Sequence, residues 1–224
     1  MRSGRCSIAT TKRPQVDPAS ILEFARLVID ALESARVPYL LGGSLASAVW
    51  GEPRSTLDVD FVVSLRLERI GTLSRALEQR SILIPADVML SQLEETRGDV
   101  AIVGYHLQTG FKAELFPLRP GDALRESALA RRVRIDLGPP LGRIYVHTAE
   151  DLILYKLLYF DLSAQTKHVR DIVSILLSRA TDLDYGYLTT WVQQLGLAVA
   201  WQLMLVEARR LGASVPSDSG PDQT

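Results

Sequence analysis

Two aspartates lie two residues apart in a segment that otherwise consists of strand-forming residues. Asp58 and Asp60 belong to the stretch LDVDFVV, residues 57–63. Successive side chains of a strand alternate between its faces, so both carboxylates project from the same face. Carboxylates this close repel each other unless a cation or water separates them. The flanking residues are too apolar for a solvated edge, so we expect a partner cation such as Mg²⁺; an exposed strand face is the ordinary alternative.

A glycine pair and a serine precede this strand. Gly42, Gly43 and Ser44 follow the apolar run VPYLL and open the stretch SLASAVW, which we expect to form a short helix. Glycine lets a backbone approach a ligand closely, and a helix N-terminus presents free N–H groups to an anion. Ser44 can contact a phosphate or simply cap the helix. Arg54, in the following turn, can meet a phosphate or bridge to Asp58.

A third acid lies in a second apolar stretch, FKAELF. An unpaired charge at Glu114 is costly in such surroundings. A salt bridge to Lys112, two residues away on the same face, is the ordinary explanation. The alternative is that Glu114 joins Asp58 and Asp60 as a metal ligand.

A lysine interrupts the apolar run of residues 152–160 near the start of the C-terminal region. Lys156 can snorkel or pair structurally with Asp171. It can also place a point charge on a triphosphate, with Asp171 orienting it. Lys167 is a competing partner, because it lies four residues before Asp171. His168 is expected at the surface.

Hydrophobic periodicity predicts a mixed α/β half followed by an all-helical half. The change near residue 147 suggests a core over 19–147, a helical domain over 148–212, and disordered tails at 1–18 and 213–224. The expected helices cover residues 20–35, 44–50, 66–79, 85–95, 121–130, 148–160, 165–179, 185–194 and 197–211. The expected strands cover residues 37–41, 57–63 and 81–84, a hairpin of 99–107 and 111–118 turned by Gly110, and edge strands at 131–137 and 143–146.

Composition indicates a globular protein of the cytoplasm. The 224 residues carry 25 Lys and Arg against 26 Asp and Glu, and Cys6 is the single cysteine, which excludes an intramolecular disulfide and fits a reducing compartment. We expect no membrane span, because the apolar stretches are too short.

Two regions are locally basic. Residues 119–143, with six arginines, and residues 1–18 each have a net charge of +3, which would favour binding to a phosphate backbone.

Together these features resemble the nucleotidyltransferase superfamily, which has the polymerase-β-like fold. The stretch GEPRSTLDVDFVV has the R-x-T-x-D-h-D form common in its small prokaryotic members. The stretches EDLILYKLLYF and KHVRDIVSIL, which contain Lys156 and Asp171, are similar to the second signature of the AbiEii/MenT-like toxin branch. The resemblance covers roughly residues 20–180. It implies an α/β (α+β) fold, in which a nucleotidyltransferase core with a mixed sheet is followed by a C-terminal helical bundle.

The resemblance also implies a reaction, in which a nucleoside monophosphate moves from an NTP to an acceptor and pyrophosphate is released. Two Mg²⁺ ions about 3.5–4 Å apart serve such a transfer. The implied metal ligands are Asp58, Asp60 and Glu114, although the third acid of the family is often Asp. The implied catalytic residues are Asp58, Asp60, Glu114, Lys156 and Asp171, and the implied nucleotide ligands are Gly42, Gly43, Ser44, Arg54 and Lys156.

The acceptor is the least determined part of the hypothesis. In the toxin branch it is RNA, notably the tRNA 3′ end, and a cognate antitoxin protein is a possible partner. A small-molecule enzyme of the aminoglycoside type shares the GGS and DxD pattern, but the acceptor pockets of such enzymes are acidic. A non-catalytic nucleotide-binding subunit is the third alternative.

Overall fold

The protein is described from a computed structural model, in which residues 20–95 and 99–216 are placed well enough to describe. The predicted tail 1–18 lies outside these residues, as does Cys6. Residues 217–224 of the predicted tail 213–224 also lie outside them. No helix in the described part of the chain combines the length and the apolar character that a membrane span requires.

Within the described residues, seven strands form one mixed sheet in the order β3-β4-β5-β2-β1-β7-β6. Strand β2 lies at its centre, antiparallel to β1 and parallel to β5. The prediction of a mixed sheet is therefore confirmed. The strands are β1 Tyr39–Leu41, β2 Asp58–Val63, β3 Ile82–Leu83, β4 Ile102–His106, β5 Lys112–Pro117, β6 Val133–Asp136 and β7 Arg143–Val146.

The helices of the first half pack around this sheet. The helix α1 begins where the sequence indicates, because Ser20 and Glu23 form a reciprocal capping box at its N-terminus. A short 3₁₀ turn at Leu67–Arg69 replaces the first turn of the helix predicted at 66–79. The helices are α1 Ile21–Ser34, α2 Gly43–Trp50, α3 Ile70–Glu78, α4 Ala86–Glu94 and α5 Ala123–Arg131.

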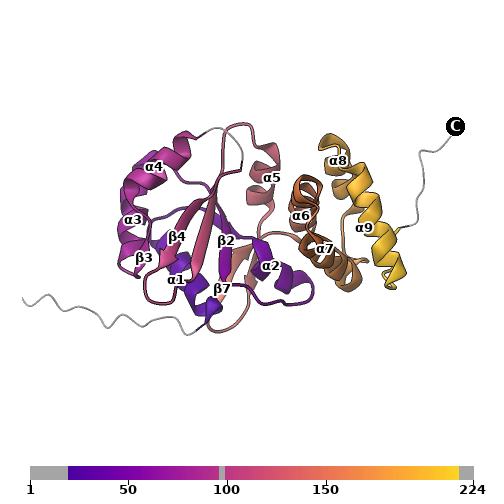
Figure 1. Cartoon of the computed structure of the whole chain (residues 1–224), viewed down its shortest axis with the longest axis horizontal. Coiled ribbons are helices and arrows are strands. Elements are labelled where there is room, and N and C mark those ends of the chain that lie inside the picture. The colour runs from indigo at the N-terminus through magenta and orange to yellow at the C-terminus, as the bar shows by residue number, and fades with distance from the viewer. Residues whose placement is uncertain (1–19, 96–98, 217–224) are drawn as a thin grey trace, which may run out of the picture.

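The second half of the described chain is helical throughout. Its helices are α6 Ala149–Ser163, α7 Thr166–Arg179, α8 Tyr185–Gln194 and α9 Ala198–Arg210. Figure 1 shows them grouped beside the sheet, and α2 contacts both α6 and α7. The buried apolar side chains of both halves belong to one continuous cluster. The change from mixed to helical structure occurs after β7, as predicted, while the division into two domains at residue 147 stays a prediction.

One strand prediction is wrong. The segment 143–146 is not an edge strand, because β7 lies between β6 and β1. It pairs in parallel with β1, where Leu41 lies opposite Val146. Such a pairing joins segments about a hundred residues apart, so local patterns cannot reveal it.

Candidate active site

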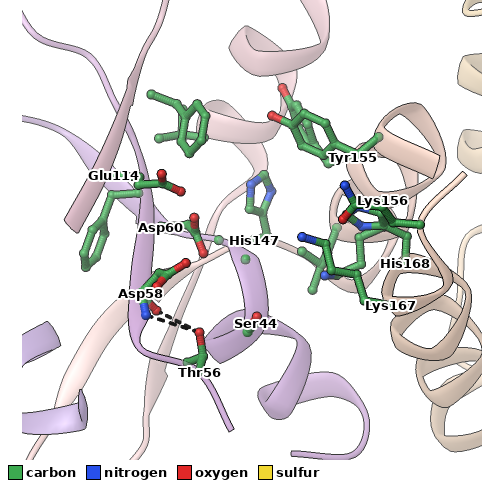
Figure 2. Close-up of a pocket in the computed structure, with 18 of the residues that line it drawn as sticks. Ser44, Thr56, Asp58, Asp60, Glu114, His147, Tyr155, Lys156, Lys167 and His168 are labelled. Carbon is green, nitrogen blue, oxygen red and sulfur yellow. Dashed lines mark hydrogen bonds between the residues drawn. The ribbon is translucent and has the colours of Figure 1, made fainter. Parts of the chain in front are cut away.

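A cavity of about 380 Å³ lies between the sheet and the helices α6 and α7. Figure 2 shows acidic side chains on its sheet side and basic side chains across from them on the helices. We call Asp58, Asp60 and Glu114 the acidic wall, and Lys156, Lys167 and His168 the helical wall. All six residues line the cavity.

The acidic wall is built by two neighbouring parallel strands. Asp58 and Asp60 project from one face of β2, as predicted, while Val59 and Phe61 are fully buried on the other. Strand β5 lies beside β2 in a register that places Glu114 directly opposite Asp60. Residues so paired have side chains on the same face of the sheet. The third acid thus reaches the same cavity as the first two.

Lys112 is part of the same arrangement. It lies opposite Asp58 on β5. Its Nζ lies 3.0 Å from Oε1 of Glu114 and 3.4 Å from Oδ2 of Asp58. The hydrogen bond to Glu114 is the main cause that raises the pKa of Lys112. The salt bridge expected as the ordinary explanation of Glu114 is therefore present, and it coexists with the placement of Glu114 in the cavity.

The carboxylates repel one another strongly enough to affect protonation. The pKa of Asp60 is raised to about 7, first by burial and then by the charge and hydrogen bond of Glu114 and the charge of Asp58. Lys156 opposes the rise from across the cavity. At neutral pH the acidic wall thus holds more negative charge than its surroundings neutralise, which is the condition that a bound cation relieves.

The glycine turn lies directly against this wall. The N–H of Gly42 donates to the main-chain oxygen of Asp60 at 2.8 Å. Gly43 begins α2 with φ +57°, and a Cβ added there would lie 1.7 Å from Oδ2 of Asp60. Only glycine fits this position without moving the carboxylate. Ser44 is buried in the next position, and all three residues of the turn line the cavity.

On the opposite side, Lys156 and Asp171 form a buried ion pair, with Nζ 2.5 Å from Oδ2. Burial lowers the pKa of Lys156, and the charge of Asp171 opposes that change. Burial favours the protonated form of Asp171, but the charge of Lys156 outweighs it and lowers the pKa. Arg54 also holds Asp171, with its Nε 3.1 Å from Oδ1. The carboxylate is thus paired with Lys156 and Arg54 and not with Lys167, and the alternative in which Arg54 bridges to Asp58 is wrong.

Several lining residues carried no signal in the sequence. His147 is buried next to the ring of Tyr155, and burial lowers the pKa of His147 to about 3, so the imidazole is neutral. In the described part of the chain neither Nδ1 of His147 nor the hydroxyl of Tyr155 has a hydrogen-bond partner. His168 is partly buried, and its ring stacks on that of Tyr159. His147 lies in the short connection between β7 and α6, and Tyr155 lies on the apolar helix α6, so neither belongs to a motif that the sequence shows.

The arginines of residues 119–143 do not form a free basic patch. Arg125 is buried, whereas Arg134 and Arg143 are exposed although they contact a ring or a carboxylate of the chain. This weakens the argument for a phosphate backbone, and the matching argument on residues 1–18 lies outside the described residues. The partners are backbone carbonyls for Arg119, Asp99 and Asp122 for Arg125, Glu150 and Asp151 for Arg131, the ring of Tyr145 for Arg132 and Arg134, and Asp136 for Arg143.

The donor chemistry of the acidic wall fits a hard divalent cation. Carboxylate oxygens are the ligands that Mg²⁺ prefers in proteins, and here they lie on rigid strands beside a glycine turn. In residues 20–95 and 99–216, however, no three His, Cys, Asp or Glu side chains already converge on one metal position. Asp58 and Glu114 each give one oxygen to Lys112, while Asp60 has no ion pair with it, so a cation at this wall would share oxygens that Lys112 now contacts.

Comparison with known proteins places this arrangement in a known fold. No protein-family model and no curated protein sequence matches the chain. Among solved structures it is similar to the antibiotic-resistance factor ANT(2'')-Ia, with 14% identity, a TM-score of 0.50, and coverage of 85% of this chain and 96% of that one. It is also similar to an antigenic nucleotidyltransferase-like protein from Paracoccidioides brasiliensis, with 18% identity, a TM-score of 0.51, and coverage of 88% and 94%. The chain therefore has the polymerase-β-like nucleotidyltransferase fold, followed by a helical C-terminal part.

Proposed function

We propose that this protein is a Mg²⁺-dependent nucleotidyltransferase that moves a nucleoside monophosphate from an NTP to an acceptor hydroxyl and releases pyrophosphate. The observation that carries the proposal is the composition of one cavity. Its sheet side presents three carboxylates, and its other sides present a glycine turn at a helix N-terminus and the ammonium group of Lys156. A triphosphate with its metal needs these three kinds of group within reach of one another.

The residues of the sheet side act on the reacting end of the nucleotide. Asp58 and Asp60 are the proposed metal ligands, and Mg²⁺ bound there supplies charge neutralisation at the transferring phosphoryl group. Glu114 lies beside Asp60 and is the proposed base for the proton of the acceptor hydroxyl. The hydroxyl oxygen forms a bond to the α-phosphorus while the bond from that phosphorus to the β-phosphate bridging oxygen breaks.

The remaining sides hold the rest of the triphosphate. Gly42, Gly43 and Ser44 line the cavity at the N-terminus of α2, where the free N–H groups of a helix suit the β- and γ-phosphates. Lys156 adds a point charge, and Asp171 and Arg54 fix its position through the shared ion pair. Arg54 lines the cavity as well, so it lies within the proposed nucleotide site even though its main partner is Asp171.

For the acceptor we propose RNA, notably the tRNA 3′ end, which would make the protein a cytoplasmic toxin with a cognate antitoxin as partner. The support is that the residues of the R-x-T-x-D-h-D form line the same cavity as Lys156, which is paired with Asp171 behind it. The arginines of residues 119–143 lend this proposal little support, since only Arg134 and Arg143 among them are exposed.

A small-molecule acceptor is the second candidate, and one observation favours it. The cavity, at about 380 Å³, has the size of a pocket for a small ligand. ANT(2'')-Ia, one of the similar structures, is an antibiotic-resistance factor. The cationic lining residues Arg54, Arg125, Lys156 and Lys167 outnumber the three carboxylates, which disfavours a polycation such as an aminoglycoside.

The test is NTP-dependent labelling of total RNA and of a panel of small molecules, with Mg²⁺ and each α-labelled NTP in turn. We expect transfer to RNA, and a loss of at least about a hundredfold in Asp58→Ala and Asp60→Ala, because each removes a metal ligand. Asp136→Ala is the matched control, since Asp136 is an exposed strand acid on β6 away from the cavity.

Full labelling by folded Asp60→Ala would contradict the proposed chemistry. Labelling of a small molecule in place of RNA would leave the chemistry standing and replace the acceptor. If calorimetry detects no binding of Mg²⁺-NTP to the wild-type protein, the third alternative, a subunit without catalytic activity, is favoured.

A further inference from the structure

Lys112 lies among the carboxylates of the acidic wall. Lys112 reaches across from β5, and its Nζ contacts carboxylates of two different strands, Asp58 on β2 and Glu114 on its own strand. The lysine side chain is 27% exposed. It is therefore neither a surface lysine pointing to water nor a fully enclosed ion pair.

The backbone cannot relieve the crowding that Lys112 neutralises. The register of β2 and β5 places Asp58 opposite Lys112 and Asp60 opposite Glu114, and both strands are central in the sheet. Lys156, which lines the cavity on the helical side, is already paired with Asp171. Lys112 is thus the cation that balances the carboxylates in the protein without metal.

A bound divalent cation needs the same oxygens. Lys112 donates to one oxygen of Asp58 and one of Glu114, and a metal ion held by the wall takes up carboxylate oxygens of this set. Two cations close together also repel each other. The strands are fixed, whereas lysine has a flexible four-carbon side chain that is partly open to solvent.

We propose that Lys112 is a displaceable internal counter-ion of the acidic wall. Its ammonium group holds the place of the divalent cation in the metal-free protein and leaves when that cation binds, so Lys112 sets the metal concentration at which the site fills. This inference rests on the proposed function, because that proposal assigns Asp58 and Asp60 as metal ligands. Lys112 is a positioning residue, since it acts on the metal site and not on the reacting atoms.

Direct metal binding tests the inference without any measurement of activity. Full-length wild-type protein, Lys112→Met and Lys112→Arg are titrated with Mn²⁺, and the free ion is followed by electron paramagnetic resonance. Removing two partly exposed ion pairs should make Lys112→Met bind Mn²⁺ about three- to tenfold more tightly. Lys112→Arg keeps the charge and should stay within about twofold of wild type.

Thermal unfolding supplies a second readout of the same exchange. In EDTA, Lys112→Met should melt below wild type, because the carboxylates have lost their counter-ion. In saturating Mn²⁺ that difference should shrink, because the metal ion replaces the ammonium group. If Lys112→Met does not fold, Lys112→Gln, which keeps a polar side chain, takes its place in both measurements.

Equal or weaker Mn²⁺ binding by the uncharged variants overturns the inference, as does an absence of Mn²⁺ binding by wild type and variant alike. The failure of the proposed function looks different. In that case Mn²⁺ binds with the expected order of affinities, but no NTP and acceptor give labelled product.

Discussion

The two sides of the cavity handle buried charge in opposite ways. On the sheet side Asp58 and Glu114 share Lys112, while burial and the charges of the neighbouring carboxylates raise the pKa of Asp60. On the helical side Lys156 and Arg54 both pair with Asp171, and the pKa of that carboxyl is lowered. The surroundings thus disfavour the ionised carboxylate of Asp60 on the sheet side and favour the ionised carboxylate of Asp171 on the helical side.

This difference in charge balance indicates that the acidic wall binds a ligand, whereas the ion pairs of Asp171 stabilise the fold. A site that must attract a cation keeps an excess of negative charge, and strands provide the rigid frame that prevents the acids from separating. A buried ion pair has no such excess, and breaking it leaves a charge without compensation. Substitutions on the acidic wall should therefore affect ligand binding more than folding, while substitutions around Asp171 should affect both.

The largest effect, and the strongest test of this difference between the two sides, is expected for Asp171→Ala. It leaves the buried ammonium of Lys156 without its closest partner, and the side chain of Lys156 is only 6% exposed. We expect a loss of about 3–5 kcal/mol in the free energy of unfolding. Urea denaturation at pH 7.5 measures it, with Asp136→Ala as the control. A loss below about 1 kcal/mol would mean that the two sides do not differ in this respect.

A smaller effect is expected at the contact between the glycine turn and the acidic wall. Gly43→Ala places an L-residue at φ +57° and a Cβ against the carboxylate of Asp60. The left-handed backbone alone costs about 1–2 kcal/mol. Urea denaturation gives this cost, and Mn²⁺ titration should show weaker binding, because the carboxylate must move. Gly110→Ala, at φ +72° in an open hairpin turn, is the matched control and should lose stability but keep Mn²⁺ affinity.

The smallest effect has the opposite sign and depends on pH. The pKa of Asp60 is raised from 3.8 to about 7, so the folded protein holds a proton that the unfolded chain releases near pH 4. The resulting stabilisation is lost as the pH rises toward and through 7. At pH 8 in EDTA, Asp60→Asn should therefore be about 0.2–1 kcal/mol more stable than wild type, because one of three like charges is gone.

At pH 5 this advantage of Asp60→Asn should be smaller, since Asp60 of the wild type is then protonated. The comparison is made with the variant because His147 and His168, whose pKa values are lowered to about 3 and about 4, make both proteins less stable below pH 6.5. A variant that is less stable than wild type at pH 8 would show that Asp60 is paired, and would remove the contrast between the two sides.

Local patterns predicted most of the fold. The two-residue alternation placed Asp58 and Asp60 on one face, and the helices and strands of the described chain lie within a few residues of their expected positions. The structure departs from these expectations mainly in how the strands pair. Strand β7 lies inside the sheet, and the register of β5 with β2, which sets Glu114 opposite Asp60, joins segments more than fifty residues apart.

By itself the sequence determined which side chains share a strand face, where helices begin, and that a glycine turn precedes an acidic strand, because these follow from backbone geometry over a few residues. Only the tertiary structure decided which charges meet. It joined Arg54 to Asp171, set Lys112 between two acids, and brought His147 to the cavity. Long side chains from distant segments can reach several partners, so the choice among them depends on how the sheet and the helices pack.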